Sequence, residues 1–114
     1  MKIESYSFGR MKVAGEIYKK DLIISGERVT SPWWRKEGHN LQWEDLAGKI
    51  ARGTEVVVVG TGAYGVMKVP QSLREQIEKS GLSLREAKTE EAVKIFNELS
   101  AQGKKITGAF HLTC

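Results

Sequence analysis

The sequence has a single cysteine, Cys114, so no disulfide can form within the chain. A chain without disulfides is typical of a reducing compartment. The sequence also lacks a long hydrophobic run: the longest apolar stretch is four valines at 56–59, whereas a membrane span needs about 20 apolar residues. No apolar segment of the signal-peptide kind is found near residue 1. These absences predict a cytoplasmic protein that does not engage a membrane.

Runs of like charge are missing as well. The chain carries 18 basic and 14 acidic residues, a net charge of +4, and nowhere places five or six like charges in succession. Nucleic-acid-binding proteins usually gather basic residues on one face or along one helix. We therefore expect no specific nucleic-acid partner. The length and the ordinary composition predict one globular domain over residues 1–114.

The spacing of apolar residues divides this domain into two parts. Residues 1–38 hold short apolar stretches separated by glycines, which predicts an antiparallel β-meander. Residues 39–114 alternate between helical and strand patterns, which predicts an α/β fold with a largely parallel or mixed sheet. Ser72 and Thr89 are the predicted N-caps of the second and third helices. The predicted helices lie near 43–52, 73–80 and 90–102, and the predicted strands near 55–59, 82–87 and 105–112.

Directly after the four valines, Gly60, Gly62 and Gly65 have the G-x-G-x-x-G spacing of dinucleotide-binding proteins. In those proteins the third glycine lies in the first turns of a helix whose N-terminus holds the pyrophosphate. Here Pro70 disfavours helix for the residue before it, and a capping-box pattern begins only at Ser72. The helix should thus start too far from the third glycine. We interpret the segment as a turn and predict no cofactor.

The same loop retains a second interpretation as a site for a small anionic ligand or nucleotide. Successive backbone N–H groups can form an anion nest, and the C-terminal edge of an open α/β sheet is where ligands bind. In this hypothesis Lys68 supplies a nearby positive charge. The candidate ligand-binding residues are Gly60, Thr61, Gly62, Tyr64, Gly65 and Lys68.

Few residues indicate catalysis or metal binding. His111 and Cys114 are three apart and would face opposite sides of a strand, so they do not form a nucleophilic pair there. His39 could join them as a zinc ligand, but the spacing matches no known zinc site. Asn97, in the middle of a predicted helix, is either exposed or hydrogen-bonded to a neighbouring segment. We predict no metal site and no catalytic residue, and keep an enzyme using His111, Cys114 or Asn97 as the third hypothesis.

Two adjacent tryptophans, Trp33 and Trp34, follow Pro32. Neighbouring residues of an extended chain face opposite ways, so one tryptophan could be buried and the other exposed. An exposed tryptophan is a typical anchor for a protein partner. The alternative is that both pack over the edge of the sheet.

Several short motifs, in order along nearly the whole chain, carry a resemblance to a known family. The motifs are Ser7-Phe8-Gly9, Met11-Lys12-Val13, Gly60-x-Gly62, Lys68-Val69-Pro70, Gly81, Thr89-Glu90-x-Ala92-Val93, Asn97, Gly103 and Phe110-His111-x-Thr113-Cys114. With these motifs the chain resembles a family of domains of unknown function that includes the adipogenesis-associated cytosolic protein of animals, a mitochondrial complex I assembly factor, and short bacterial and archaeal proteins. The resemblance implies a three-layer α/β fold with a central mixed sheet and an added N-terminal β-meander. It implies no established enzymatic activity and no cofactor.

The favoured functional hypothesis is therefore a non-catalytic interaction or assembly module with an unidentified protein partner. Trp33 and Trp34 are its candidate partner-binding residues. The alternative is the small anionic ligand at the glycine loop. Edge strands of the predicted meander could also pair between two copies of the chain and form a homodimer.

Overall fold

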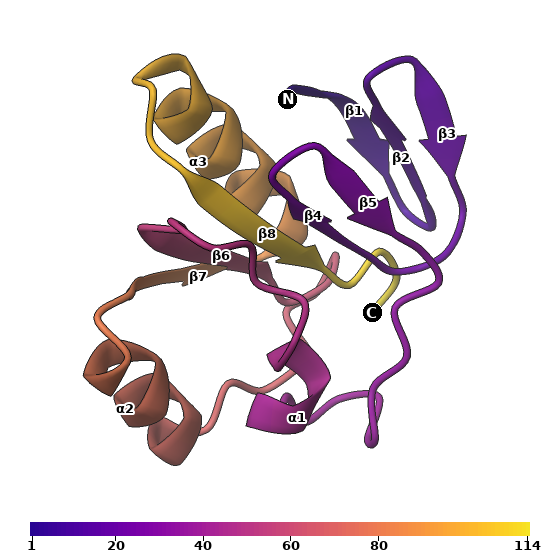
Figure 1. The fold of residues 1–114 in the computed structure, drawn as a ribbon. Coiled ribbons are helices and arrows are strands. Elements are labelled where there is room, and N and C mark those ends of the chain that lie inside the picture. The colour runs from indigo at the N-terminus through magenta and orange to yellow at the C-terminus, as the bar shows by residue number, and fades with distance from the viewer.

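The computed structural model describes all 114 residues. Figure 1 shows a central sheet with α3 and a small sheet on one side and α1 and α2 on the other. This three-layer arrangement confirms the predicted α/β fold class. No helix combines the length and the apolar character needed to cross a bilayer. The elements in chain order are β1 (Ile3–Ser7), β2 (Arg10–Val13), β3 (Glu16–Tyr18), β4 (Leu22–Ser25), β5 (Arg28–Thr30), α1 (Trp43–Leu46), β6 (Val56–Gly60), α2 (Gln71–Lys79), β7 (Ser83–Ala87), α3 (Thr89–Ala101) and β8 (Ile106–Phe110).

The central sheet has five strands in the order β5-β4-β8-β6-β7. Strand β6 is parallel to both of its neighbours, whereas β4 is antiparallel to β8 and to β5, so the sheet is mixed. All five residues of β6 are buried. A strand paired on both edges and covered on both faces is apolar at every position, which is why four successive valines form it.

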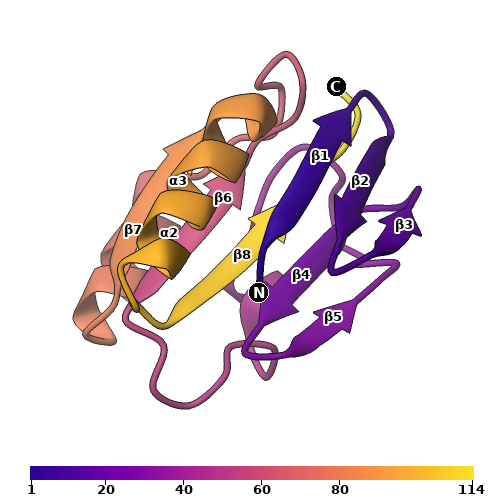
Figure 2. The ribbon, with the colours of Figure 1, turned by 90° about the horizontal axis from the view of Figure 1, so that it is seen from above.

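Alternate valines of β6 belong to two separate hydrophobic cores. Val56 and Val58 face the core that contains Phe96 of α3 and residues of the small sheet β1-β2-β3. Val57 and Val59 face the core beneath α1 and α2. The view from above places α3 and β1 on the same side of the central sheet (Figure 2). The sheet is thus the wall between the two cores.

The N-terminal part differs from the expected meander over 1–38. Only β1, β2 and β3 form the separate antiparallel sheet. The hairpin of β4 and β5 instead extends the central sheet, because every residue of Leu22–Ser25 is buried and such a strand needs cover on both faces.

Two predicted helix boundaries are also corrected. The first helix covers only Trp43–Leu46 instead of 43–52, because Gly48 adopts a φ of +76° and the chain leaves the helix at Ala47. The second helix begins at Gln71 with Pro70 as its N-cap, and so Ser72 lies inside its first turn. Pro70 has a φ of −61° and a ψ of 152°, the extended backbone that is typical of an N-cap residue.

Candidate functional site

The glycine loop leaves the C-terminal end of β6 and runs alongside residues 111–114. Each backbone N–H from Thr61 to Val66 donates a hydrogen bond within the protein, so none is left free for an anion nest in this conformation. Binding of an anion there requires residues 113–114 to move, and the loop site stays a prediction. The acceptors, in order, are the carbonyl of Ala87, Oγ1 of Thr89, and the carbonyls of Thr113, Cys114, Gly62 and Cys114 again, at 2.6–3.3 Å.

Close packing accounts for two of the three glycines of the loop without a nucleotide. Gly62 has a φ of +107°, and a Cβ there would collide with the backbone of Cys114 and lie 2.8 Å from the ring of His111. A Cβ at Gly60 would lie 2.9 Å from both Phe110 and Thr89. Only glycine lets the loop approach the chain end this closely. The remaining loop candidates are at the surface or bonded internally: Tyr64 and Lys68 are exposed, and Oγ1 of Thr61 donates to the carbonyl of Ala87.

Thr89 lies in the crevice between the C-terminal ends of β6 and β7, whose following helices cover opposite faces of the sheet. This switch point is where many α/β proteins bind ligands. Here Oγ1 of Thr89 accepts the N–H of Gly62 at 2.9 Å and donates to the carbonyl of His111 at 2.6 Å. Thr89 is the first residue of α3, and Lys88 is the N-cap, which corrects the predicted role of Thr89. The threonine joins the loop to the chain end and fills the crevice.

A buried polar cluster lies beside this crevice. Oδ2 of Asp21, just before β4, is 2.7 Å from Nδ1 of His111 and 2.8 Å from Nη1 of Arg35. Oδ1 of the same carboxylate accepts the N–H of Leu112 at 2.8 Å. The guanidinium of Arg35 stacks over Trp33 at 4.7 Å and donates to the carbonyl of Gly38. The carboxylate of Asp21 is thereby paired with the guanidinium of Arg35 and hydrogen-bonded to the imidazole of His111, and these side chains are 18%, 5% and 7% exposed, respectively.

The geometry places a proton on Nδ1 of His111. A nitrogen 2.7 Å from a carboxylate oxygen must carry a proton, so Nδ1–H donates to Asp21. The other ring nitrogen, Nε2, is buried and forms no hydrogen bond. The ring of His39 lies edge-on to that of His111, with centroids 5.5 Å apart. A carboxylate-oriented imidazole is the form that serves as a general base, but this Nε2 is out of contact with solvent.

Hydrogen bonding dominates the ionisation of Asp21. Burial by itself raises the pKa of the carboxyl, but the hydrogen bonds from His111, from the N–H of Leu112 and from Arg35 together outweigh burial and hold the pKa below its ordinary value. Asp21 is therefore ionised throughout the neutral range.

The other residues considered for chemistry are not assembled into a reactive site. The only free cysteine, Cys114, is exposed and forms no hydrogen bond with the imidazole of His111. No group of three or more His, Cys, Asp or Glu residues has a metal-binding arrangement. The side chain of Asn97 bonds to both the N–H and the carbonyl of Ile3, at 2.9 and 2.8 Å, and thus holds β1 against α3.

The two tryptophans have opposite environments. Trp33 is 3% exposed, and its Nε1 donates to the carbonyl of Asp45 at 2.9 Å. Trp34 is 79% exposed. Of the two residues predicted as partner anchors, the structure leaves only Trp34 at the surface.

Two further aromatic side chains are exposed near residues 111–114. Phe8, at the turn between β1 and β2, is 56% exposed, and Tyr64 of the glycine loop is 69% exposed. Their ring centroids are 6.1 Å apart. The N–H of Gly9 bonds to Leu112 and that of Tyr64 to Cys114, so both rings are carried by segments tied to residues 111–114. Trp34 lines a hollow together with Thr113 of the same segment, and we call Phe8, Trp34 and Tyr64 the aromatic rim.

Sequence reasoning did not single out Asp21 or Arg35. Both lie in loops, and their partner His111 is 90 and 76 residues away, respectively. A weak local signal was present, because Asp21 directly precedes an apolar strand and Arg35 directly follows two tryptophans. Neither pattern specifies which polar groups meet in space.

Comparison with known proteins places the chain in a family. Residues 3–111 match the sequence profile of a family described as "Protein of unknown function (DUF498/DUF598)". The chain belongs to this family. It is 30% identical to a conserved hypothetical protein, PH1505 of Pyrococcus horikoshii OT3, over all of both chains, and the two structures have a TM-score of 0.82.

More distant structures share the fold. A protein of Bartonella henselae described as an outer membrane protein is 21% identical, with 98% of this chain and 94% of that chain covered and a TM-score of 0.81. A Mth938-like domain of Bordetella pertussis is 17% identical, with 97% and 85% covered and a TM-score of 0.74. At these identities the likeness concerns the fold alone.

Proposed function

We propose that the protein is a non-catalytic interaction module whose partner binds at the aromatic rim. The observation that carries this proposal is the exposure of Trp34. A large aromatic side chain that is exposed to solvent presents a substantial apolar area that a partner could bury. Tryptophan is also among the residues that most often dominate the binding energy of an interface.

The backbone beneath Trp34 is held on both sides, which supports its use as an anchor. The preceding Trp33 is buried and its N–H bonds to the carbonyl of Asp21 at 2.8 Å. The following Arg35 has a buried side chain paired with Asp21. A partner would not have to order this segment, and so little entropy is lost on binding.

The charge around Trp34 favours an acidic partner. Lys19 and Lys20 line a hollow of about 410 Å³ next to Trp34, and neither forms an ion pair. The only acidic residue that lines this hollow, Asp21, is already bound by Arg35 and His111. We infer a partner segment that combines an apolar or aromatic side chain with acidic residues, because it would complement both features.

Affinity capture with matched variants tests this proposal. Trp34→Ala should keep the melting temperature and lose a protein that the wild type retains from a lysate of its source. Ile17→Ala removes another exposed apolar side chain, on β3 and outside the aromatic rim, and should retain that protein. The captured protein should lose binding when its acidic residues at the contact are neutralised.

Three results would contradict the proposal. The first is equal retention by Trp34→Ala and the wild type. The second is a large fall in melting temperature for Trp34→Ala, which would make Trp34 a structural residue. The third is self-association: if sedimentation shows a dimer of the wild type that Trp34→Ala abolishes, the rim binds a second copy of the chain and not an acidic partner.

A further inference from the structure

A separate cavity of about 340 Å³ opens at the other end of the central sheet, where β6 and β8 begin. Its walls come from four places in the chain: Met1, the turn at Gly26, the loop 51–54, and α3 with the residues that follow it. This volume is within the range of small-molecule sites, about 300–1,000 Å³. The aromatic rim lies at the opposite ends of the same strands.

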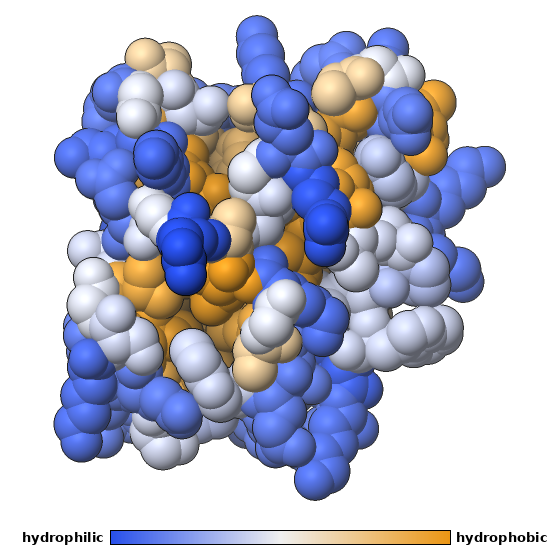
Figure 3. Space-filling view, viewed as in Figure 1, coloured by the Kyte–Doolittle hydropathy of each residue, from blue (hydrophilic) through white to orange (hydrophobic).

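The lining combines positive charge with an apolar floor. Arg52, Lys104 and Lys105 line the cavity, no acidic residue does, and none of the three cations forms an ion pair. Phe96 and Ile106 supply buried apolar surface. On the face seen in Figure 3, hydrophobic atoms are visible at the centre and hydrophilic groups surround them.

The three cations are not needed to complete the local structure. The carbonyls at the end of α3 already accept hydrogen bonds from the N–H groups of residues 102–104. The nearby carboxylate of Glu55 accepts the backbone N–H of Lys105 at 3.0 Å, not its ammonium group. The cationic side chains are thus free for a ligand.

One wall of the cavity is held by a closed ring of hydrogen bonds. The N–H of Ala51 donates to Oγ of Ser25, and Oγ1 of Thr54 donates to the carbonyl of Ala51, both at 2.7 Å. Thr107 lies between the two hydroxyls, 2.7 Å from Ser25 and 2.9 Å from Thr54. Since Thr54 uses its proton on Ala51, Thr107 donates to Thr54 and Ser25 donates to Thr107. Every group in the ring is satisfied, which keeps the loop 51–54 in place.

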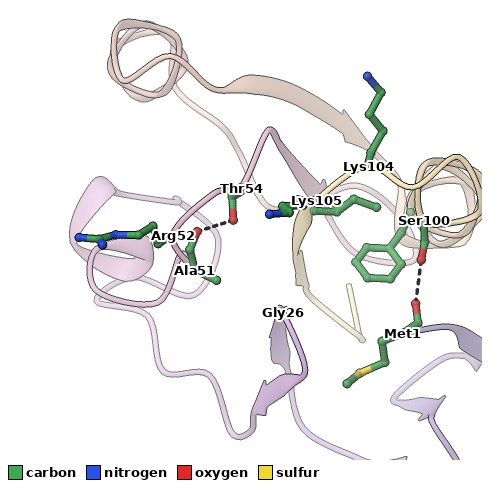
Figure 4. A pocket seen from close by; sticks show the side chains of 10 residues that line it. Met1, Gly26, Ala51, Arg52, Thr54, Ser100, Lys104 and Lys105 are labelled. Atoms are coloured by element: carbon green, nitrogen blue, oxygen red, sulfur yellow. Dashed lines mark hydrogen bonds between the residues drawn. The ribbon is translucent and has the colours of Figure 1, made fainter.

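The arrangement of the side chains suits an anion held at the mouth. Figure 4 shows Lys105 extending across the cavity toward Thr54, whereas the charged ends of Arg52 and Lys104 point outward from its rim. Ser100 lies on the α3 side, where its hydroxyl donates to the carbonyl of Met1. Lys105 is therefore the cation placed to hold the anion, and Arg52 and Lys104 add positive charge at the rim.

We propose that this cavity binds a small organic phosphate, with the phosphate at Lys105 and the neighbouring cations and the apolar body on Phe96 and Ile106. A dianionic group matches several cations better than a monoanion does. The lining also holds apolar side chains, of which Met1 is 39% exposed, so a ligand with an apolar body would make contacts that a bare ion cannot make. This site is independent of the aromatic rim.

Amide NMR titration with three probes tests the proposal: phenyl phosphate, inorganic phosphate and phenol. Phenyl phosphate should give saturable shifts at Ala51, Thr54 and Ile106, with no shifts at Gly62 and Gly65. It should bind at least tenfold more tightly than either inorganic phosphate or phenol, because each of these lacks one of the two features.

Charge variants identify the site. Lys105→Gln should weaken phenyl phosphate binding about tenfold, and Ser100→Glu should weaken it further by placing a negative charge in the lining. Lys94→Gln removes an exposed cation of α3 that is outside the cavity and should bind as the wild type does. Each of three results would overturn the proposal. Phenyl phosphate could cause no saturable shifts, inorganic phosphate could bind as tightly as phenyl phosphate, or Lys105→Gln and Lys94→Gln could lose equal affinity for phenyl phosphate.

Discussion

At the scale of single residues, Asp21 organises the end of the sheet that carries the candidate site. Its two carboxylate oxygens bind His111, Arg35 and the backbone of Leu112. Removal of one member of such a set leaves the others without a partner. The resulting loss in free energy of unfolding is larger than the net stabilisation that the complete set provides. Asp21 therefore stabilises the segments that carry the rim without having to contact a partner.

Asp21→Asn should lower the free energy of unfolding by about 3 kcal/mol near pH 7, because Arg35 stays buried without its counter-ion. The folded-state pKa of Asp21 is below the unfolded value, so the stabilisation is present above that unfolded value, about 4, and is lost as the pH falls through the folded-state pKa. Urea unfolding of the wild type and of Asp21→Asn from pH 7 to pH 3 should show that the difference between their free energies of unfolding becomes smaller at acid pH.

Glu44→Gln is the control for this series, because Glu44 forms only an exposed pair with Lys36 and should change stability by less than about 0.5 kcal/mol. A gap between wild type and Asp21→Asn that is unchanged at pH 3 would contradict the assigned ionisation.

At the scale of elements, local patterns predicted most helices and strands, and tertiary contacts decided their ends. The predicted strands near 55–59 and 82–87 correspond to β6 and β7, and the helix near 90–102 corresponds to α3. The prediction that no helix starts at the glycine loop is confirmed, since α2 begins at Gln71. The predicted length of the first helix was wrong, because the periodicity of apolar residues does not indicate the left-handed conformation of Gly48.

Gly62→Ala tests whether the glycine loop exists to pack against the chain end. The substitution should lower the free energy of unfolding by about 3 kcal/mol or more, since a Cβ would meet the backbone of Cys114 and the ring of His111 at a positive φ. Gly103→Ala is matched, with a φ of +80° and no atom near its Cβ, and should cost only about 1 kcal/mol. Thermal unfolding of both variants measures the difference between their losses in free energy of unfolding. Equal losses would show that the contact of Gly62 with residues 111–114 is unimportant for stability.

At the scale of the whole molecule, the small sheet β1-β2-β3 is held to the central body through few polar contacts. Asn97 of α3 satisfies both backbone groups of Ile3, and Ile3, Met11 and Val13 complete the core under α3. Phe8 of the aromatic rim lies on the turn that this sheet presents. The position of the rim therefore depends on docking of the small sheet.

Asn97→Ala should lower the free energy of unfolding by about 2 kcal/mol, because the N–H and the carbonyl of Ile3 lose their hydrogen-bond partners. Hydrogen exchange should quicken in β1 and β2 before it quickens in β6, which lies between the two cores. Glu98→Ala, at the exposed neighbouring position, should leave exchange unchanged. Uniform loss of protection over the chain would contradict separate docking of the small sheet.

The sequence by itself determined most of the elements, the α/β class and the family, because periodicity, propensity and ordered motifs are local properties of the chain. Four valines require a strand covered on both faces. Only the tertiary structure decided that Trp33 is buried while Trp34 is exposed, that Thr89 closes the crevice, and that His111 meets Asp21. These arrangements depend on how loops far apart in sequence pack together, and no local pattern of residues specifies that packing.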